Sequence, residues 1–318
     1  MALYLITGGA GFIGSHLAEE LLRRGARVRV LDNFSTGKRE NLAGLGPHFE
    51  LIEGDIRSYH TVHQAVRDVD YVLHQGALPS VPRSINDPIT TNEVNVGGTL
   101  NLLDAARDAG VKRVVYASSS SVYGTNSQVP KREDMTPQPI SPYAVSKLTG
   151  EHYCQVFSRT YGLETVSLRY FNVFGPRQDP QSAYSAFIPK FAAGILRHQE
   201  LTVDGDGTQS RDFTYVRNVV EANLLAATAP GVSGEVFNIA CGASLSVNEV
   251  VTHLAQLCGT QARLVHGPSR AGDVPHSLAD ISRAKKCLNY APQVGAREGL
   301  AQVVAWFQNK FALEGRSP

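Results

Sequence analysis

Two side chains that can exchange protons, Tyr143 and Lys147, lie four residues apart in a segment with helical apolar spacing. On a helix, residues at this separation share one face, about one turn apart. A tyrosine with a pKa of about 10 is a poor base at neutral pH, but a nearby ammonium favours the phenolate. Four serines, Ser118–Ser121, follow an apolar run that reads as a strand. Together these residues could remove the proton from a substrate hydroxyl, with a serine orienting that oxygen.

A second group of residues has the spacing of a dinucleotide site. Gly8, Gly11 and Gly14 stand between an apolar strand pattern and the start of a helix pattern. Such a loop lets the backbone approach a pyrophosphate, which the helix N-terminus attracts. Asp32 ends the second strand pattern, at about the ~20-residue separation expected of an acid that binds the adenosine ribose.

The acid also bears on the choice of cofactor. A carboxylate at Asp32 would repel a 2′-phosphate, which favours NAD, whereas Lys38 and Arg39 keep NADP open. Asp55 follows the third strand pattern and has two interpretations: a contact with the adenine amino group, or a cap for the helix that begins near Ser58.

The elements that must position these residues alternate along the chain. Strands are predicted at Leu3–Ile6, Arg27–Leu31, Phe49–Ile52, Tyr71–His74, Arg113–Ala117 and Thr165–Arg169. Helices are predicted at Ser15–Arg24, Ser58–Arg67, Glu93–Ala109, Pro142–Tyr161, Ala183–Arg197, Val216–Thr228, Val247–Cys258 and Gly295–Lys310. This order predicts an α/β fold, a doubly wound parallel sheet of the Rossmann type, with a smaller C-terminal α/β cap domain. We expect residues 1–172 to bind NAD, with some later segments returning to that domain, and residues 173–318 to form the interleaved cap.

Composition narrows the class further. The 318 residues carry 30 Lys+Arg against 29 Asp+Glu, a net charge of +1, so no nucleic-acid partner is indicated. No run approaches the ~18 apolar residues of a membrane helix. Cys154, Cys241, Cys258 and Cys287 show no C-x-x-C pairing, which favours reduced thiols over a metal site and indicates a cytoplasmic protein.

The motifs together carry a resemblance. The glycine loop Thr7–Gly14 and Tyr143-Ala-Val-Ser-Lys147 resemble the extended short-chain dehydrogenase/reductase superfamily. Additional matches resemble its nucleotide-sugar 4-epimerases, namely Ser118–Gly124, Leu168–Asn172, Asp204–Gly207, Arg211–Phe213 and Ala279–Asp280. Segments Ser80–Pro88 and Phe171–Pro180 look most like the branch that acts on UDP-N-acetylglucosamine and UDP-glucose.

The resemblance assigns roles to individual residues. It implies that the catalytic residues are Ser119, Tyr143 and Lys147. The implied NAD-binding residues are Gly8, Gly11, Phe12, Ile13, Gly14, Asp32, Asn33, Ser35, Thr36, Gly37, Asp55, Ile56, Gln75, Ala77, Ser118, Tyr143, Lys147 and Tyr170. The implied UDP-sugar contacts are Ser80, Val81, Ser119, Ser120, Ser121, Tyr143, Asn172, Arg211, Arg270, Asp273 and Ser277.

The activity implied is reversible inversion at C4 of a UDP-hexose through a transient 4-keto sugar, with NAD retained. Ser277 stands where relatives restricted to non-acetylated sugars carry tyrosine. UDP-N-acetylglucosamine and UDP-N-acetylgalactosamine should therefore fit in addition to UDP-glucose and UDP-galactose. The superfamily also implies a homodimer through Glu93–Ala109 and Pro142–Tyr161.

Three alternatives stay open at this point. A UDP-glucuronate 4-epimerase uses the same cycle and differs in what meets the C5 substituent. A sugar-nucleotide 4,6-dehydratase needs a carboxyl acid/base pair beside the catalytic hydroxyl, and no Asp or Glu lies between Ala117 and Gly124. A non-catalytic NAD-sensing module would need the glycine loop but neither Tyr143 nor Lys147.

Overall fold

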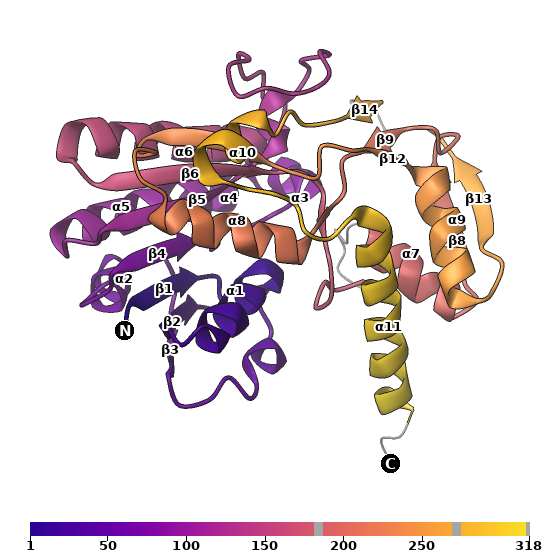
Figure 1. The fold of residues 1–318 in the computed structure, drawn as a ribbon, viewed down its shortest axis with the longest axis horizontal. Coiled ribbons are helices and arrows are strands. Elements are labelled where there is room, and N and C mark those ends of the chain that lie inside the picture. Colours follow the sequence, from indigo (N-terminus) through magenta and orange to yellow (C-terminus); the bar gives the residue numbers. More distant parts are fainter. Residues whose placement is uncertain (181–186, 269–274, 316–318) are drawn as a thin grey trace.

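The computed structural model describes residues 1–180, 187–268 and 275–315, and a parallel sheet of seven strands organises its N-terminal part (Figure 1). Its strands, in chain order, are β1 (Leu3–Thr7), β2 (Arg27–Asp32), β3 (Phe49–Glu53), β4 (Tyr71–His74), β5 (Arg113–Ser119), β6 (Glu164–Tyr170) and β11 (Glu235–Ile239). Their spatial order is β11-β6-β5-β4-β1-β2-β3, the order of a doubly wound dinucleotide-binding sheet with one further strand at an edge. The predicted fold class is confirmed.

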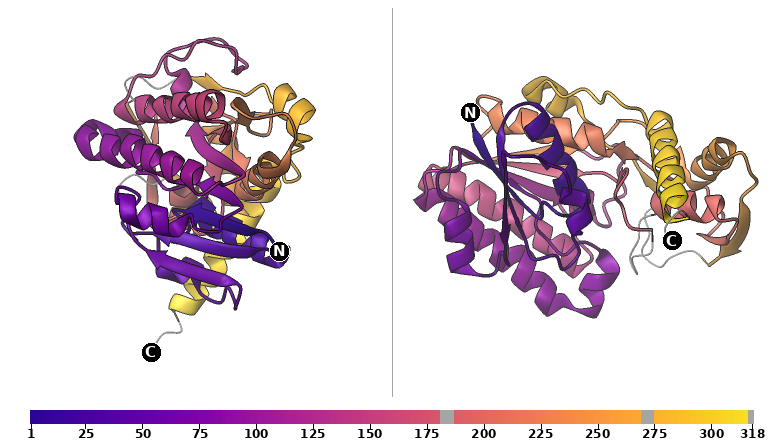
Figure 2. Two further views of the ribbon diagram at one scale, coloured as in Figure 1. Left: turned by 90° about the vertical axis from the view of Figure 1, so that its left-hand side faces the viewer. Right: turned by 90° about the horizontal axis from the view of Figure 1, so that it is seen from below.

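Helices cover both faces of this sheet, as a parallel sheet with two apolar faces requires (Figure 2). One face packs against α1 (Phe12–Arg23) and α8 (Val216–Thr228), and the other against α2 (Tyr59–Ala65), α5 (Gly98–Asp108) and α6 (Pro142–Tyr161). Two separate clusters of buried apolar side chains fill the two interfaces.

Short elements complete this part of the chain. They are the single turns η1 (Arg39–Leu42), η2 (Glu93–Gly97) and η3 (Ser120–Tyr123) and the helices α3 (Val81–Asn86), α4 (Pro88–Asn92) and α10 (Ser282–Leu288). η2 is a π-helical turn that continues into α5. Helices α3 and α4 pack on α6, so the chain after β4 lies close to the helix that carries Tyr143.

The remaining elements form a smaller layer beside the carboxyl ends of the strands (Figure 1). They are α7 (Phe187–Leu196), α9 (Val247–Cys258), α11 (Ala296–Glu314) and the parallel pair β8 (Glu200–Asp204) and β13 (Arg263–Gly267). A third apolar cluster, which includes Phe191, Phe213, Val250 and Phe307, holds them together.

Strands of two residues connect this layer to the large sheet. They are β7 (Val173–Phe174), β9 (Ser210–Arg211), β10 (Thr214–Tyr215), β12 (Leu245–Ser246) and β14 (His276–Ser277). β7 pairs with β10, and β9 lies between β12 and β14. Because each ladder is this short, side chains must supply much of the order at the junction.

The structure changes several predicted boundaries. The first helix begins at Phe12 rather than Ser15, directly after the glycine loop, and the helix predicted from Glu93 opens with the π turn η2. Of the helix predicted at Ala183–Arg197, residues 183–186 lie outside the described part. The strands β7 to β14 and the helices α3, α4 and α10 were not predicted from the sequence. Within the described residues, no helix has the length and apolar character needed to cross a membrane.

Candidate active site

Helix α6 carries Tyr143 and Lys147, and its start is fixed by local sequence. The Ser141 hydroxyl accepts a hydrogen bond from the Ala144 amide at 3.1 Å, and Pro142 occupies the first turn, where no intrahelical N–H bond is lost. Gly162 ends the helix in a left-handed conformation. The helix therefore begins one residue before Tyr143, which places that side chain at the end of the helix beside the carboxyl end of β5.

Ser119, Tyr143 and Lys147 converge at this edge. The Ser119 oxygen accepts hydrogen bonds from the Ser121 amide at 3.2 Å and from the Ser121 hydroxyl at 2.9 Å, which leaves its own proton for the hydrogen bond that it makes with Tyr143. The Lys147 ammonium lies 6.0 Å from the centre of the Tyr143 ring and donates to the Ala117 carbonyl at 2.7 Å. The structure thus brings the three predicted catalytic residues together.

Burial opposes the effect on Tyr143 that we expect from Lys147 together with a bound nicotinamide ring. Burial raises the pKa of the Tyr143 phenol, against the smaller opposing effect of the Ser119 hydrogen bond. Burial also lowers the pKa of Lys147 to about 8, although nearby Glu151 favours the charged form. Because the ammonium is directed at the Ala117 carbonyl, the residues of this chain do not by themselves shift Tyr143 toward the phenolate.

A buried ion pair behind Ser118 was not anticipated. Glu151, one turn beyond Lys147 on α6, pairs with Arg169 of β6 at 2.7 Å, and both side chains are almost fully buried. Ser118 donates its hydroxyl to Glu151, so this side chain faces the ion pair although the residue lines the cleft. The four-residue spacing from Lys147 to Glu151 was the available indication in the sequence.

The glycine loop fits a pyrophosphate. Gly8 has a φ of +66°, and a Cβ added at Gly14 would lie 2.3 Å from the Gly8 carbonyl oxygen, so neither position accepts a side chain without displacement of the loop. Helix α1 begins from Gly11, which offers no side-chain cap, and its first turn carries no acidic residue. Its first amides and the positive end of the helix dipole are therefore available to an anion.

Asp32 lies where the ribose of a dinucleotide is expected, at the carboxyl end of β2. One carboxylate oxygen accepts a hydrogen bond from the Ala10 amide and the other from the Phe34 amide, both at 2.8 Å. Burial raises the pKa of this carboxyl group, against these two hydrogen bonds. The amide of Ala10 thus connects the acid directly to the glycine loop.

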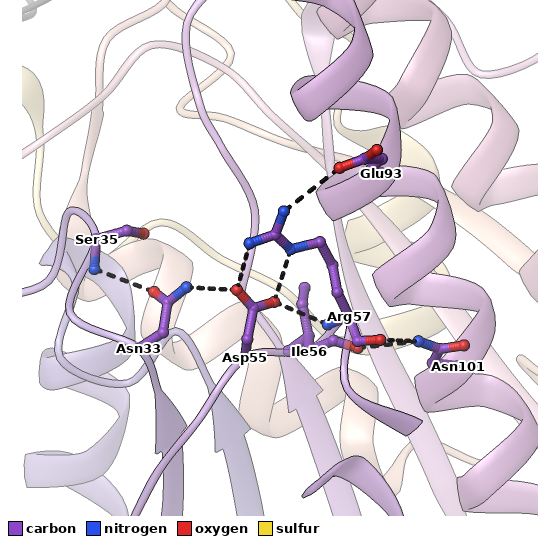
Figure 3. Close-up of polar contacts among 7 residues, drawn as sticks. All are labelled: Asn33, Ser35, Asp55, Ile56, Arg57, Glu93 and Asn101. Carbon is purple, nitrogen blue, oxygen red and sulfur yellow. Dashed lines mark hydrogen bonds and ion pairs between the residues drawn. The ribbon is translucent and has the colours of Figure 1, made fainter. Parts of the chain in front are cut away.

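A polar network surrounds the neighbouring Asp55 (Figure 3). Its carboxylate accepts hydrogen bonds from Asn33 at 2.9 Å and from the Arg57 guanidinium at 2.8 Å, and Arg57 lowers the pKa of Asp55 to about 2. Ser58 rather than Asp55 caps α2, since its oxygen accepts from the Thr61 amide. Arg57 was not foreseen as part of this region.

The two cations that kept NADP open are occupied by carboxylates. Lys38 pairs with Asp179 at 2.9 Å, and Arg39 pairs with Glu53 and covers the Phe34 ring at 4.1 Å. A 2′-phosphate would have to compete with these contacts in addition to the charge of Asp32.

One cleft joins the glycine loop to the catalytic residues. The predicted cofactor residues that line it are Gly8, Gly11, Phe12, Ile13, Gly14, Asp32, Asn33, Ser35, Thr36, Asp55, Ile56, Gln75, Ala77, Ser118, Tyr143, Lys147 and Tyr170. Gly37 lies beside the cleft, packed against Ala10 and Asp32. The lining residues that the sequence analysis did not include are Leu31, Gly54, Gly76, Leu78, Pro79, Val94 and Ala117. Most of these are apolar neighbours of predicted residues. Their position at or near the ends of the predicted strands was the sequence signal that could have identified them.

The predicted substrate residues surround the junction of the two parts. Ser80 has a φ of +99° and caps α3 through its hydroxyl, so Val81 begins that helix. Ser120 and Ser121 open η3, directly after Ser119. Of the remaining predicted residues, Asn172 follows β6 of the large sheet, and Arg211 in β9 and Ser277 in β14 lie in the short strands that connect the two parts. Arg270 and Asp273 lie outside the described residues.

Comparison with known proteins agrees with this geometry. Residues 4–240 match the model of the NAD dependent epimerase/dehydratase family, and the chain belongs to that family. A UDP-glucose 4-epimerase of Mycolicibacterium smegmatis is 39% identical over 310 residues, which cover 96% of this chain and 98% of that protein. The resemblance seen in the sequence is thereby confirmed.

Solved structures show the same relationship. A UDP-N-acetylglucosamine 4-epimerase from Methanobrevibacter ruminantium superimposes with a TM-score of 0.93 at 38% identity, covering 97% of this chain and 99% of that one. A UDP-glucuronic acid 4-epimerase from Bacillus cereus, in complex with UDP-glucuronic acid and NAD, gives 0.90 at 34% identity, covering 97% and 99%. The predicted cofactor, NAD, is that of the family, and the glycine loop with Asp32 fits it.

Proposed function

We propose that the protein catalyses the reversible inversion of C4 in a UDP-hexose. The observation that carries the proposal is the hydrogen-bonded pair of Ser119 and Tyr143 beside Lys147, at the end of a cleft with the geometry of an NAD site. Such an arrangement can move the proton of a hydroxyl group and the hydride of the carbon that carries this group.

The residues of the chain handle the proton. The Tyr143 phenolate removes the proton from O4 of the sugar and becomes the neutral phenol, and the hydrogen bond from Ser119 stabilises the phenolate before that transfer. The glycine loop and Asp32 would hold NAD, which would supply the acceptor for the C4 hydride and the donor for its return to the opposite face of the sugar. Lys147 holds positive charge beside Tyr143 and, in this proposal, binds the nicotinamide ribose. The proton returns from Tyr143 to O4 when the hydride returns to C4. No net oxidation of the sugar therefore occurs.

The substrate is held, in this proposal, mainly by residues from Asn172 onward in the sequence. Arg211 and Arg270 bind the diphosphate, because a planar guanidinium can make two charge-assisted bonds to it. Asn172 and Ser119–Ser121 contact the sugar, with Ser80 and Val81 beside it, and Asp273 binds the uridine ribose. NAD binding falls to residues 1–172 with later segments such as β11, and UDP-sugar binding to residues 173–318.

The finer substrate choice is part of the proposal. Ser277 lies in β14, in register with Arg211 of β9, so the small side chain is close to the proposed diphosphate ligand. A serine there leaves room for a C2 acetamido group, which supports UDP-N-acetylglucosamine and UDP-N-acetylgalactosamine as substrates in addition to UDP-glucose and UDP-galactose. The similarity to a UDP-glucuronic acid 4-epimerase keeps the uronate as the second candidate.

Assembly and location are proposed on two observations. Val145 and Val156 on α6 are about half exposed, which supports a homodimer in which α6 and the helix that follows η2 pack against a second copy. Cys154, Cys241, Cys258 and Cys287 are all unpaired thiols, which supports a cytoplasmic location.

The test is incubation of the purified protein with UDP-N-acetylglucosamine, UDP-glucose and UDP-glucuronate separately, with the C4 configuration followed by NMR. We expect the galacto-configured product from the first two. Turnover of the uronate alone would establish the second candidate instead, and a 4-keto-6-deoxy product would establish a dehydratase. NADH that accumulates in proportion to product would exclude an epimerase. If no substrate gives a product, the non-catalytic NAD-sensing module is the remaining candidate.

A further inference from the structure

Asp212 is a buried acid that the proposed reaction does not use. It lies directly after Arg211, between β9 and β10, and its side chain has 0% exposure. One carboxylate oxygen accepts a hydrogen bond from the Cys241 amide at 2.9 Å. The other accepts from the Gly242 amide at 2.9 Å and from the Ala279 amide at 3.3 Å. These donors are backbone amides from two segments far apart in the sequence.

The backbone of Asp212 makes two more contacts, and both involve proposed substrate residues. Its amide donates to the Ser277 carbonyl at 2.8 Å, and its carbonyl accepts from the Asn172 side chain at 3.3 Å. Asp212 is covalently joined to Arg211. One residue therefore contacts the segments that present Arg211, Asn172 and Ser277.

The strands at this point are too short to hold that arrangement alone. β9 and β14 pair in parallel over two residues, Ser210–His276 and Arg211–Ser277, and β12 pairs with β9 over two residues (Figure 1). The carboxylate of Asp212 adds hydrogen bonds to Cys241 and Gly242, after β11, and to Ala279, two residues after β14. Truncation of this carboxylate would leave the buried Ala279 amide and the part-buried amides of Cys241 and Gly242 without this acceptor, and an unpaired buried amide costs more than the loss of an exposed bond.

The charged and titratable groups near Asp212 do not hold this backbone in place of its carboxylate. Burial raises the pKa of the carboxyl group to about 6, against the amide hydrogen bonds, and Cys241 and Tyr290 are the titratable neighbours that feel its charge. The Arg211 guanidinium instead donates to the Ser210 and Pro275 carbonyls at 2.9 and 3.1 Å. Asp212 therefore acts on the backbone that carries Arg211, not on its charge.

We propose that Asp212 is a positioning residue for the UDP-hexose: its carboxylate aligns Arg211 with Asn172 and Ser277, and it thereby sets substrate affinity without touching substrate. This inference rests on the proposed function, which assigns those three residues to the UDP-sugar. It implies a change in KM with little change in kcat, since Ser119, Tyr143 and Lys147 are held by β5 and α6.

The test compares Asp212→Asn with Asn218→Ala in the NAD-loaded full-length protein. Asn218 is a matched control, because its buried side chain also joins distant backbone, at Gln293 and Val294. Near Asp212 it reaches the Cys241 thiol at 3.7 Å, and among the described residues its side chain makes no hydrogen bond to β9 or β14. For Asp212→Asn we expect KM for the UDP-hexose to rise roughly tenfold or more and kcat to stay within about threefold. For Asn218→Ala we expect a lower Tm and an unchanged KM.

Binding of UDP by calorimetry separates this inference from the proposed function. If the wild type binds UDP at least tenfold more tightly than Asp212→Asn, the positioning role holds even where no UDP-hexose is turned over. Wild-type KM and UDP affinity in a destabilised Asp212→Asn protein would overturn it, as would a fall in kcat alone or a wild type that does not bind UDP. Should Asp212→Asn not fold, Asp212→Ser, which keeps one acceptor oxygen in less volume, is measured in the same way.

Discussion

The two ends of the proposed site are held in different ways. At the cofactor end, the residues follow strands of four to seven residues whose parallel ladders run without interruption, and glycines allow close backbone contact. At the substrate end, the residues lie in or beside strands of two residues, and buried side chains such as Asp212 bond to backbone amides. Regular hydrogen bonding thus fixes one half and individual side chains fix the other, so a substitution should act on one ligand at a time.

The largest effect is expected where the two halves meet. Replacement Tyr143→Phe removes the proposed base and should lower kcat by at least ~100-fold, because the O4 proton has no other acceptor of this kind. The measurement is the rate of interconversion of UDP-hexoses by NMR. Tyr161→Phe, at the exposed end of the same helix, is the control and should retain full activity. A Tyr143→Phe enzyme that works at a near-normal rate would rule out the assignment.

A change confined to the cofactor half should affect NAD alone. In Gly14→Ala the new Cβ would meet the Gly8 carbonyl oxygen at 2.3 Å and the Gly9 Cα at 2.7 Å, so the loop must move. We expect NAD affinity to fall at least roughly tenfold, a change of about 1.4 kcal/mol, with UDP affinity retained. Gly97→Ala, where the added Cβ meets nothing within 4 Å, should leave both affinities unchanged. An equal loss of affinity for NAD and for UDP would contradict the division of the site into two halves.

A change confined to the substrate half should alter selectivity. Ser277→Tyr adds bulk beside the proposed sugar site and should reduce kcat/KM for UDP-N-acetylglucosamine by roughly tenfold relative to UDP-glucose. NAD affinity should not change, and Ser277→Ala should preserve the substrate ratio. The ratio of the two rates is read from parallel NMR assays. Equal losses on acetylated and plain sugars would show that Ser277 does not select between them.

The last comparison concerns stability rather than activity or binding, namely the response of each half to acid. Burial lowers the pKa of His74, between Thr7 and Thr99 of the cofactor half, to about 3. The unfolded chain takes up this proton near pH 6.5 and the folded chain does not, so His74 should reduce the free energy of unfolding by about 2 kcal/mol between pH 6.5 and 5.

Asp212 in the substrate half should act in the opposite direction. Its pKa is raised to about 6, so the folded chain binds the proton first and gains about 1 kcal/mol over the same pH interval. Denaturant unfolding of wild type, His74→Gln and Asp212→Asn at the two pH values measures both terms. Differences from wild type that have the same sign for both variants would refute the comparison.

The sequence was informative where a function depends on local spacing. The positions of Gly8, Gly11 and Gly14 depend on one turn, and the four-residue spacing of Tyr143 and Lys147 depends on one helix. The structure brings both groups to one cleft. Helix α6 lies at its predicted bounds because Ser141, Pro142 and Gly162 mark its ends chemically. The NAD site was predictable for the same reason.

The sequence was least informative where position depends on distant segments. β11 joins the large sheet from residue 235, and nothing local distinguishes its apolar run from a strand of the smaller layer. Arg57 gains its role from its partner Asp55. Glu151 gains its role from Arg169, although a charged residue in a helix usually faces solvent. The phenol of Tyr143 was expected to be acidified by Lys147, but burial and the direction of the ammonium decide otherwise.

By itself, the sequence determined the doubly wound class, the loop proposed for the pyrophosphate and the pair of residues proposed for proton transfer, since periodicity and spacing along one element encode them. The tertiary structure alone decided how Arg211, Asn172 and Ser277 come together around Asp212. Those contacts join segments separated by as many as 67 residues, and their strands are too short to leave a periodic pattern in the sequence.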